Sequence, residues 1–94
     1  MSLIDSHCHL KTFVQKHTLD SVLSRAKNAD VEKFITVGTS IQDWDCYQSL
    51  AQNNADIFYS VGLHPCYVAS DWVVDVEKIQ YYWESHCKPV ALGE

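Results

Sequence analysis

The sequence predicts an α/β fold with a parallel sheet, because strand-like and helix-like segments alternate along its 94 residues. The strand-like segments are short apolar runs rich in β-branched and aromatic residues, and the segments between them carry apolar residues at helical spacing. Right-handed crossovers through helices make successive strands parallel. The length fits one domain, residues 1–94, and no Pro/Ser-rich linker divides it.

The first half of the chain predicts two strands and one helix. A short apolar segment, residues 3–6, runs into His7-Cys8-His9 as the first strand. A helix should begin near Thr18, which is a suitable N-cap. Its apolar face is formed by Leu19, Val22, Leu23 and Ala26. Residues 34–38, Phe-Ile-Thr-Val-Gly, are typical of a buried strand.

The second half repeats this alternation twice. A helix is expected from about Ser40, its cap, with an apolar side formed by Ile41, Trp44, Tyr47, Leu50 and Ala51. Residues 57–62 predict the third strand. A further helix from about Asp71 has Val76, Ile79 and Trp83 at helical spacing. Residues 89–93 predict the fourth strand.

Composition and charge exclude several classes of protein. Hydrophobic residues make up 47% and charged residues 20%, which is typical of a folded protein and not of a disordered one. No apolar run is long enough to span a membrane. The formal charge of −5 excludes a basic groove that holds nucleic acid by charge alone. The four cysteines are expected to be reduced thiols, and the cytoplasm is the expected location because the first residues do not form a signal peptide.

Each of the three glycines closes a predicted strand, and polar residues follow at those ends. Gly38 is followed by Thr39, Gly62 by Leu63 and His64, and Gly93 by Glu94. Ligands bind at the carboxyl ends of parallel strands, where glycine allows sharp turns or close approach. Simple punctuation of the strand ends is the alternative interpretation.

The first strand closes on a His-x-His pair. Residues two apart on a strand point to the same side, so His7 and His9 can face one ion while Cys8 points away. Asp5 has the same parity and could support the pair. Imidazole pairs suit zinc, manganese or iron, and added carboxylates extend the range to magnesium. Taken alone, the pattern also fits two unrelated histidines, and a zinc finger through Cys8 lacks a second ligand pair.

Two further residues are candidates for the same site. His64 could be a metal ligand, a phosphate contact or a proton donor, and Glu94 could bind one metal or bridge two. An inert loop histidine and a surface glutamate are the alternatives. His17 and His86 lie at helix boundaries and are expected to be solvated.

Four motifs in register resemble the TatD family of metal-dependent deoxyribonucleases, within the amidohydrolase-like group. The motifs are residues 4–10 (Ile-Asp-Ser-His-Cys-His-Leu), 37–39 (Val-Gly-Thr), 61–65 (Val-Gly-Leu-His-Pro) and 91–94 (Ala-Leu-Gly-Glu). Each is weak alone, but their order and positions at strand ends are specific as a set. The resemblance covers the whole chain.

The resemblance implies a (β/α)8 TIM-type barrel, of which this chain holds the first four strands, with a metal centre at its C-terminal face. It implies that His7, His9 and Glu94 bind one or two divalent ions (Mg, Mn or Zn). His64 would lie near the scissile phosphate and act with Glu94 in catalysis. DNA is the implied substrate, hydrolysed by metal-activated water.

A barrel of this kind needs roughly 250 residues. The ligands that the family takes from later strands, two histidines and an aspartate, have no counterpart in these 94 residues. We therefore expect the chain alone to lack nuclease activity, and to self-associate or to pair with the missing half of the barrel. A hydrolase with a non-nucleic-acid substrate on the same scaffold and a non-catalytic fragment that acts only as an assembly unit are the alternative hypotheses.

Overall fold

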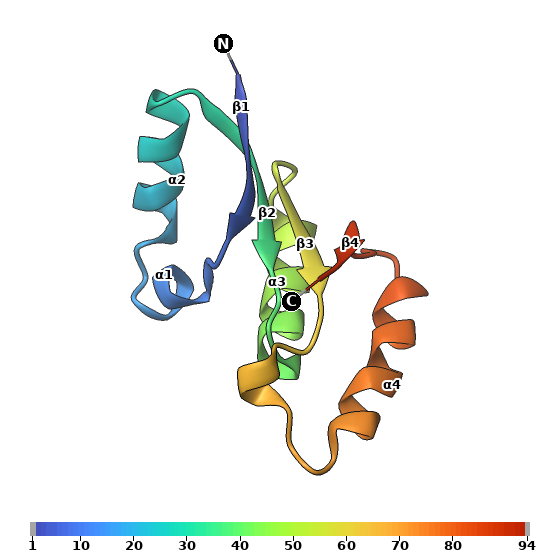
Figure 1. Cartoon of the computed structure of the whole chain (residues 1–94). Coiled ribbons are helices and arrows are strands. Elements are labelled where there is room, and N and C mark those ends of the chain that lie inside the picture. Colours follow the sequence, from blue (N-terminus) through green and yellow to red (C-terminus); the bar gives the residue numbers. More distant parts are fainter. Residues whose placement is uncertain (1, 94) are drawn as a thin grey trace.

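The computed structural model of the protein describes residues 2–93, and the predicted alternation of strands and helices is present (Figure 1). The elements in chain order are β1 (Leu3–Cys8), α1 (Lys11–Gln15), α2 (Leu19–Asn28), β2 (Val31–Val37), α3 (Ile41–Asn53), β3 (Ile57–Val61), a 3₁₀ helix (Pro65–Tyr67), α4 (Trp72–Trp83) and β4 (Ala91–Leu92).

The four strands form one sheet in the order β1-β2-β3-β4, and every neighbouring pair is parallel. Phe34 of β2 pairs with Ile57 of β3, and the register continues to Val37 and Ser60. The parallel pairing places all carboxyl ends of the strands at one end of the sheet. The pairing of β1 with β2 is less regular and shifts register twice.

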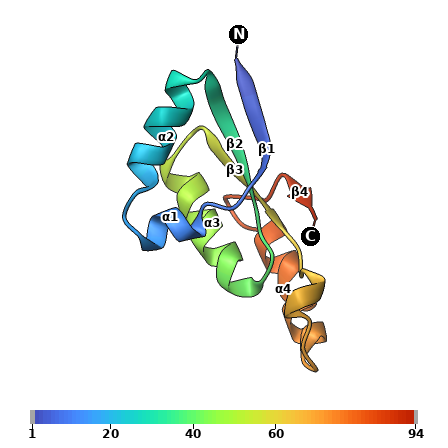
Figure 2. The ribbon, with the colours of Figure 1, turned by 60° about the vertical axis from the view of Figure 1, so that its left-hand side comes forward.

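The core lies between the sheet and the helices. Alternate residues of β2 and β3 are buried in it, together with aromatic side chains of α3 and α4. Figure 2 shows α1, α2 and α3 on the same side of the strands. The core residues are Leu10, Phe34, Trp44, Tyr47, Ile57, Tyr59, Val61 and Tyr82. Trp44, Tyr59 and Val61 are fully shielded from solvent.

The observed elements differ from the predicted ones at several boundaries. The sequence prediction missed α1 and the 3₁₀ helix, and it made the fourth strand longer than the two residues of β4. Thr18 and Ser40 occupy the predicted N-cap positions, but neither side chain makes a capping hydrogen bond. The Thr18 hydroxyl instead donates to the Phe13 carbonyl, and the backbone carbonyl of Ser40 accepts from the first turn of α3.

The predicted apolar face of α4 was wrong in part. Val76 and Trp83 are exposed, whereas Tyr82 is the buried residue of this helix. The Tyr82 ring packs edge-on against Trp44, with ring centroids 5.7 Å apart. Its hydroxyl donates to the Asp45 carboxylate, which lets a polar group enter the core without losing its hydrogen bond.

Glycine is required at Gly38 by close packing. A Cβ atom there would lie 2.6 Å from the Ser60 carbonyl oxygen and 2.6 Å from Cδ1 of Trp44. The end of β2 can therefore approach both β3 and α3 only without a side chain. Gly93 differs, since a Cβ atom there would meet nothing within 4 Å.

All four cysteines lie within residues 2–93 and are unpaired thiols. None of the helices in this part of the chain combines the length and the apolar character that crossing a membrane requires.

Candidate active-site cleft

A cleft of about 740 Å³ opens at the carboxyl ends of the first three strands. Three strand-to-helix segments, with the first turns of the helices that follow the first two strands, line it. His9 and Lys11 come from the segment after β1, Thr39 from the β2–α3 connection, Asp43 from the first turn of α3, and His64 from the loop after β3. The chain therefore collects polar side chains at the end of the sheet where ligands of parallel α/β folds bind, as the strand-end residues predicted.

The His-x-His pair is gathered at the end of β1. The ring centroids of His7 and His9 are 5.2 Å apart, and the rings meet edge to face. Both residues are exposed. Cys8 between them packs against the hydrophobic core, and its thiol lies 3.4 Å from the Ile35 carbonyl oxygen. The expected geometry, with the imidazoles on one side and Cys8 on the other, is confirmed.

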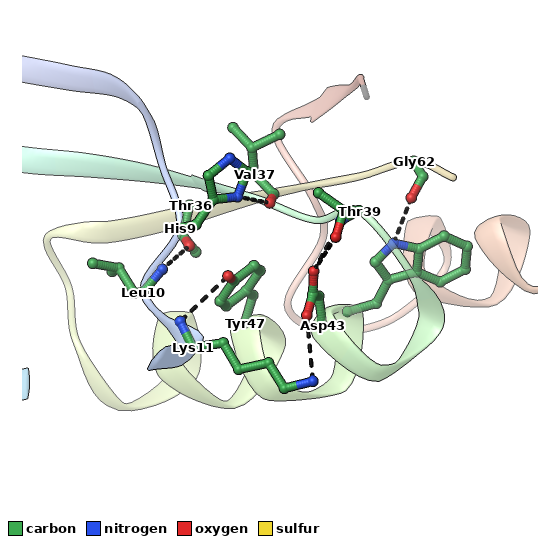
Figure 3. A network of polar contacts seen from close by, with 10 residues as sticks. His9, Leu10, Lys11, Thr36, Val37, Thr39, Asp43, Tyr47 and Gly62 are labelled. Atoms are coloured by element: carbon green, nitrogen blue, oxygen red, sulfur yellow. Dashed lines mark hydrogen bonds and ion pairs between the residues drawn. The ribbon is translucent and has the colours of Figure 1, made fainter. Parts of the chain in front are cut away.

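Backbone contacts orient this pair. The carboxylate of Asp5 accepts a hydrogen bond from the His7 amide at 3.1 Å, so Asp5 supports the pair through the main chain. The Nδ1 atom of His9 lies 3.0 Å from the carbonyl oxygen of Val37 (Figure 3). A carbonyl only accepts, so Nδ1 carries the proton and Nε2 of the neutral ring carries the lone pair. Metal-binding histidines commonly have this arrangement.

Two hydroxyl groups hold the segment that follows His9. The Leu10 amide donates to Oγ1 of Thr36 at 3.2 Å, and the Lys11 amide donates to the Tyr47 hydroxyl at 3.3 Å (Figure 3). Thr36 and Tyr47 are both buried. Burial raises the pKa of Tyr47, so its hydroxyl remains protonated at neutral pH. The start of α1 is thus fixed to both β2 and α3.

The ring of His64 has the opposite hydrogen-bonding pattern to that of His9. Its Nδ1 atom accepts a hydrogen bond from the Cys66 amide at 3.1 Å and so caps the 3₁₀ helix. An amide only donates, so in the neutral ring Nδ1 carries the lone pair and Nε2 carries the proton. The His64 amide donates to the Thr39 carbonyl at 2.8 Å. This histidine is arranged to donate from Nε2.

The loop that carries His64 is fixed by an indole group. Nε1 of the fully buried Trp44 donates to the Gly62 carbonyl at 3.0 Å. At the end of the neighbouring strand β2, the Gly38 amide donates a hydrogen bond to the Ser60 carbonyl of β3 at 3.0 Å. Trp44 thus packs closely against Gly38 at the end of β2 and binds the Gly62 carbonyl after β3.

Sequence reasoning missed a polar cluster on the cleft wall. The carboxylate of Asp43 accepts from the amide and the hydroxyl of Thr39, and its other oxygen lies 3.4 Å from Nζ of Lys11 (Figure 3). The Thr-x-x-x-Asp spacing at the start of a predicted helix could have indicated the Thr39 contact. Nothing local in the sequence could have indicated Lys11.

Burial makes Cys8 an unreactive thiol. Desolvation, and to a lesser degree the Asp5 carboxylate, raises its pKa to about 12. A thiolate is needed for both metal binding and nucleophilic attack. The Cys8 thiol is therefore protonated at neutral pH.

Within residues 2–93, no three His, Cys, Asp or Glu side chains are close enough together to form a complete metal site. His7 and His9 supply two nitrogen donors. The expected third ligand, Glu94, lies outside the described residues. His17 and His86 are exposed and do not line the cleft.

Comparison with known proteins agrees with this arrangement. The family model described as TatD related DNase matches residues 4–94. A protein of Buchnera aphidicola subsp. Baizongia pistaciae, named an uncharacterized metal-dependent hydrolase, is 34% identical; the alignment covers 100% of this chain and 36% of that protein. Deoxyribonuclease Tat-D of Schizosaccharomyces pombe is 31% identical over 80% of this chain and 27% of its own length.

The fold is matched by a crystal structure of YjjV, a TatD homologue from Escherichia coli. The TM-score is 0.82 and the identity 31%, over 98% of this chain and 36% of that one. The four parallel strands and their helices form a curled half of a (β/α)8 barrel, as predicted. The chain spans about a third of the length of the relatives it matches (36% for the Buchnera protein). By its family match and its fold, the chain belongs to the TatD-related DNase family.

Proposed function

We propose that these residues form the front part of a metal-dependent hydrolase that cleaves phosphodiester bonds in DNA. The observation that carries the proposal is the His7–His9 pair, with ring centroids 5.2 Å apart, at the strand end beside the cleft. The family match supports it, as does the name of one relative, Deoxyribonuclease Tat-D.

The available donors fit a divalent ion. Two imidazoles at one strand end, with the carboxylate of Glu94 following Gly93, form a nitrogen and oxygen set that suits Zn²⁺ or Mn²⁺ and, with further carboxylates, Mg²⁺. One or two such ions would activate water and stabilise negative charge on the phosphate oxygens. Several relatives are named metal-dependent hydrolases, which supports a metal in this family.

The chain's own residues then have distinct tasks. The Val37 carbonyl orients the His9 ring so that Nε2 presents its lone pair. His64, whose Nδ1 is occupied by the Cys66 amide, donates from Nε2 to an oxygen of the scissile phosphate. Hydrogen bonds made by the buried side chains of Thr36 and Trp44 hold the segments after β1 and β3 in place while substrate binds.

A hydrolase with another substrate is the second candidate. It is favoured by the names of the relatives in Buchnera, Escherichia coli and Haemophilus influenzae, which state metal-dependent hydrolysis and no substrate. Phosphomonoesters, esters and amides are the substrate classes to compare with DNA.

The test uses the complete barrel, meaning a polypeptide in which strands five to eight follow residues 1–94. We expect it to cleave DNA with Mg²⁺ or Mn²⁺ and to lose that activity in EDTA. Faster cleavage of an ester or amide than of DNA would replace the nuclease with the second candidate. Residues 1–94 alone should be inactive, because the described part of the chain completes no metal site. Metal-dependent cleavage by that purified fragment would contradict this expectation.

We also propose that residues 1–94 alone self-associate or pair with the remaining half of the barrel. Within residues 2–93, β1 and β4 each pair with one strand only, and Ile4 and Leu92 expose more than half of their surface. Edge strands with unpaired backbone groups recruit partners. Sedimentation at micromolar concentration should show oligomers or aggregates. A cooperative monomer would refute the proposal.

A further inference from the structure

The charges in the cleft are few and lie next to each other. Among the described residues that line it, those within 2–93, Lys11 is the only Lys or Arg and Asp43 the only Asp or Glu. The remaining side chains include neutral hydrogen-bonding groups and two histidines. They are His9, Thr12, Gln15, Thr39, Ser40, Gln42, Tyr47, His64, Cys66 and Tyr67.

Lys11 and Asp43 are unequal partners in their ion pair. The Asp43 side chain is 12% exposed and that of Lys11 is 32% exposed. One oxygen of Asp43 already accepts two hydrogen bonds from Thr39, and only the other pairs with Nζ of Lys11 at 3.4 Å. If Lys11 turned toward a ligand, Asp43 would keep both donors from Thr39. The ammonium group has three hydrogens, and Asp43 occupies one direction.

The position of Lys11 relates it to the proposed chemistry. It follows His9 by two residues, and its backbone is tied to the Tyr47 hydroxyl at 3.3 Å. The backbone of Lys11 is therefore fixed, while its ammonium end reaches Asp43, which also lines the cleft (Figure 3). A protein with a formal charge of −5 gains little general attraction for a polyanion. A local cation in the cleft is therefore more important for attracting the phosphates of such a ligand.

We propose that Lys11 forms a phosphate-binding subsite, in which its ammonium group contacts a backbone phosphate next to the one that is cleaved. This inference rests on the proposed function, because it takes a nucleic acid strand as the ligand. Asp43 positions the ammonium group in the absence of substrate. The neutral side chains of Thr12 and Gln42 line the same cleft and add no repulsion toward the strand.

A structural ion pair is the competing explanation, and it makes different predictions. A partly exposed pair contributes little to stability, and its loss would not change binding of a ligand. A phosphate contact would weaken binding of every DNA sequence about equally and would lower the salt dependence of binding.

The experiment compares K11Q, K11R and K16Q in the complete barrel. K16Q is the matched control, because Lys16 carries the same charge, is exposed at the end of α1 and does not line the cleft. Binding is measured with a short phosphorothioate DNA, which keeps its backbone charge and resists hydrolysis, over a range of salt concentrations. Cleavage of ordinary DNA is measured in parallel, and circular dichroism checks that each variant folds.

K11Q should weaken binding about 10-fold and reduce the slope of log K against log salt by about one, whereas K11R and K16Q stay close to the wild type. In cleavage, K11Q should raise KM about 10-fold with kcat nearly unchanged. Equal small effects of K11Q and K16Q would overturn the subsite while leaving the nuclease in place. Loss of binding in K11Q without any wild-type cleavage would support the subsite and overturn the nuclease. A wild type that neither binds nor cleaves DNA would overturn both.

Discussion

The ends of β1 and β3 each carry a histidine into the same cleft, yet the Nδ1 atoms of the two rings have opposite hydrogen-bonding roles. At the end of β1, Nδ1 of His9 faces a carbonyl oxygen and bears the proton. At the end of β3, Nδ1 of His64 faces an amide and bears the lone pair. The Nε2 atoms of the neutral rings therefore differ: that of His9 accepts and that of His64 donates.

The difference shows that backbone partners, and not the residue type, determine what each histidine can do. The two ends are also secured differently. Buried hydroxyls of Thr36 and Tyr47 hold the segment after β1, whereas the Trp44 indole and the close packing at Gly38 hold the end of β3. We therefore expect metal binding to depend on the first end and contact with the scissile phosphate on the second.

A third strand end gives the largest expected effect. In the complete barrel, Glu94→Ala should lower kcat/KM about 10³-fold or more, because a metal ligand contributes several kcal/mol of charge stabilisation in the transition state. His17→Ala and His86→Ala should have little effect, since both residues are exposed and outside the cleft. Steady-state nuclease assays compare the three variants. Full activity in Glu94→Ala would show that the residue after β4 is not part of the proposed site.

The division between the two histidine ends can be tested directly. His7→Ala or His9→Ala should weaken divalent binding about 100-fold. Cys8→Ala should leave binding largely intact, because Cys8 packs into the core and away from the pair. His64→Ala should also retain the metal but lower kcat about 100-fold through loss of a donor. Calorimetry and kinetics separate these outcomes, and equal loss of metal in all four variants would contradict the division.

The packing at the end of β3 predicts an effect on stability. Gly38→Ala should lower the free energy of unfolding by about 1–3 kcal/mol, because the new methyl group would lie 2.6 Å from both the Ser60 carbonyl oxygen and the Trp44 ring. Gly93→Ala is the control, and it should change stability by less than about 0.5 kcal/mol because the space there is open. Urea unfolding of both variants measures the difference. A Gly38→Ala protein as stable as the control would show that the contact relaxes easily.

The smallest effect concerns the buried thiol beside the histidines. The pKa of Cys8 is raised from 9.0 to about 12, so the unfolded thiol ionises before the folded one. Stability should therefore fall as the pH rises above 9 toward 12, since the unfolded state releases its proton first. Cys8→Ser should reduce this loss when urea midpoints at about pH 8 and about pH 10.5 are compared. The other buried thiols and phenols whose pKa values are raised by burial should contribute the remaining dependence; they are Cys46, Tyr47, Tyr59, Tyr82 and Cys87. If the urea midpoint of Cys8→Ser fell with pH as much as that of the wild type, the titrating group would be a residue other than Cys8.

The sequence was sufficient to predict the alternation of the four strands with α2, α3 and α4, and the positions of His7, His9 and His64 at strand ends. Both follow from local patterns, namely apolar runs that end in glycine and the two-residue period of a strand. The parallel order of the sheet follows from the intervening helices. The roles of these residues in metal or phosphate binding stay predictions.

Other features depend on contacts between distant residues, which a single sequence does not record. Lys11 at the start of α1 forms an ion pair with Asp43 in α3. Tyr82 of α4 is buried because its hydroxyl donates a hydrogen bond to Asp45 of α3. The helical spacing in α4 instead indicated Val76 and Trp83, which are exposed. The ring protonation of His64 could not be predicted either, because it is set by how the chain turns after β3.

The first turn of α3 gives the two strand ends a common support. Asp43 contacts Lys11 in the segment after β1, and the next residue, Trp44, binds the Gly62 carbonyl after β3. A tilt of this single turn would move both contacts together. Perturbations on the two sides should therefore be energetically coupled. A double-mutant cycle on the free energy of unfolding tests this coupling. The change caused by K11Q and Trp44→Phe together should differ from the sum of the two single changes by more than the roughly 0.3–0.5 kcal/mol typical of independent sites.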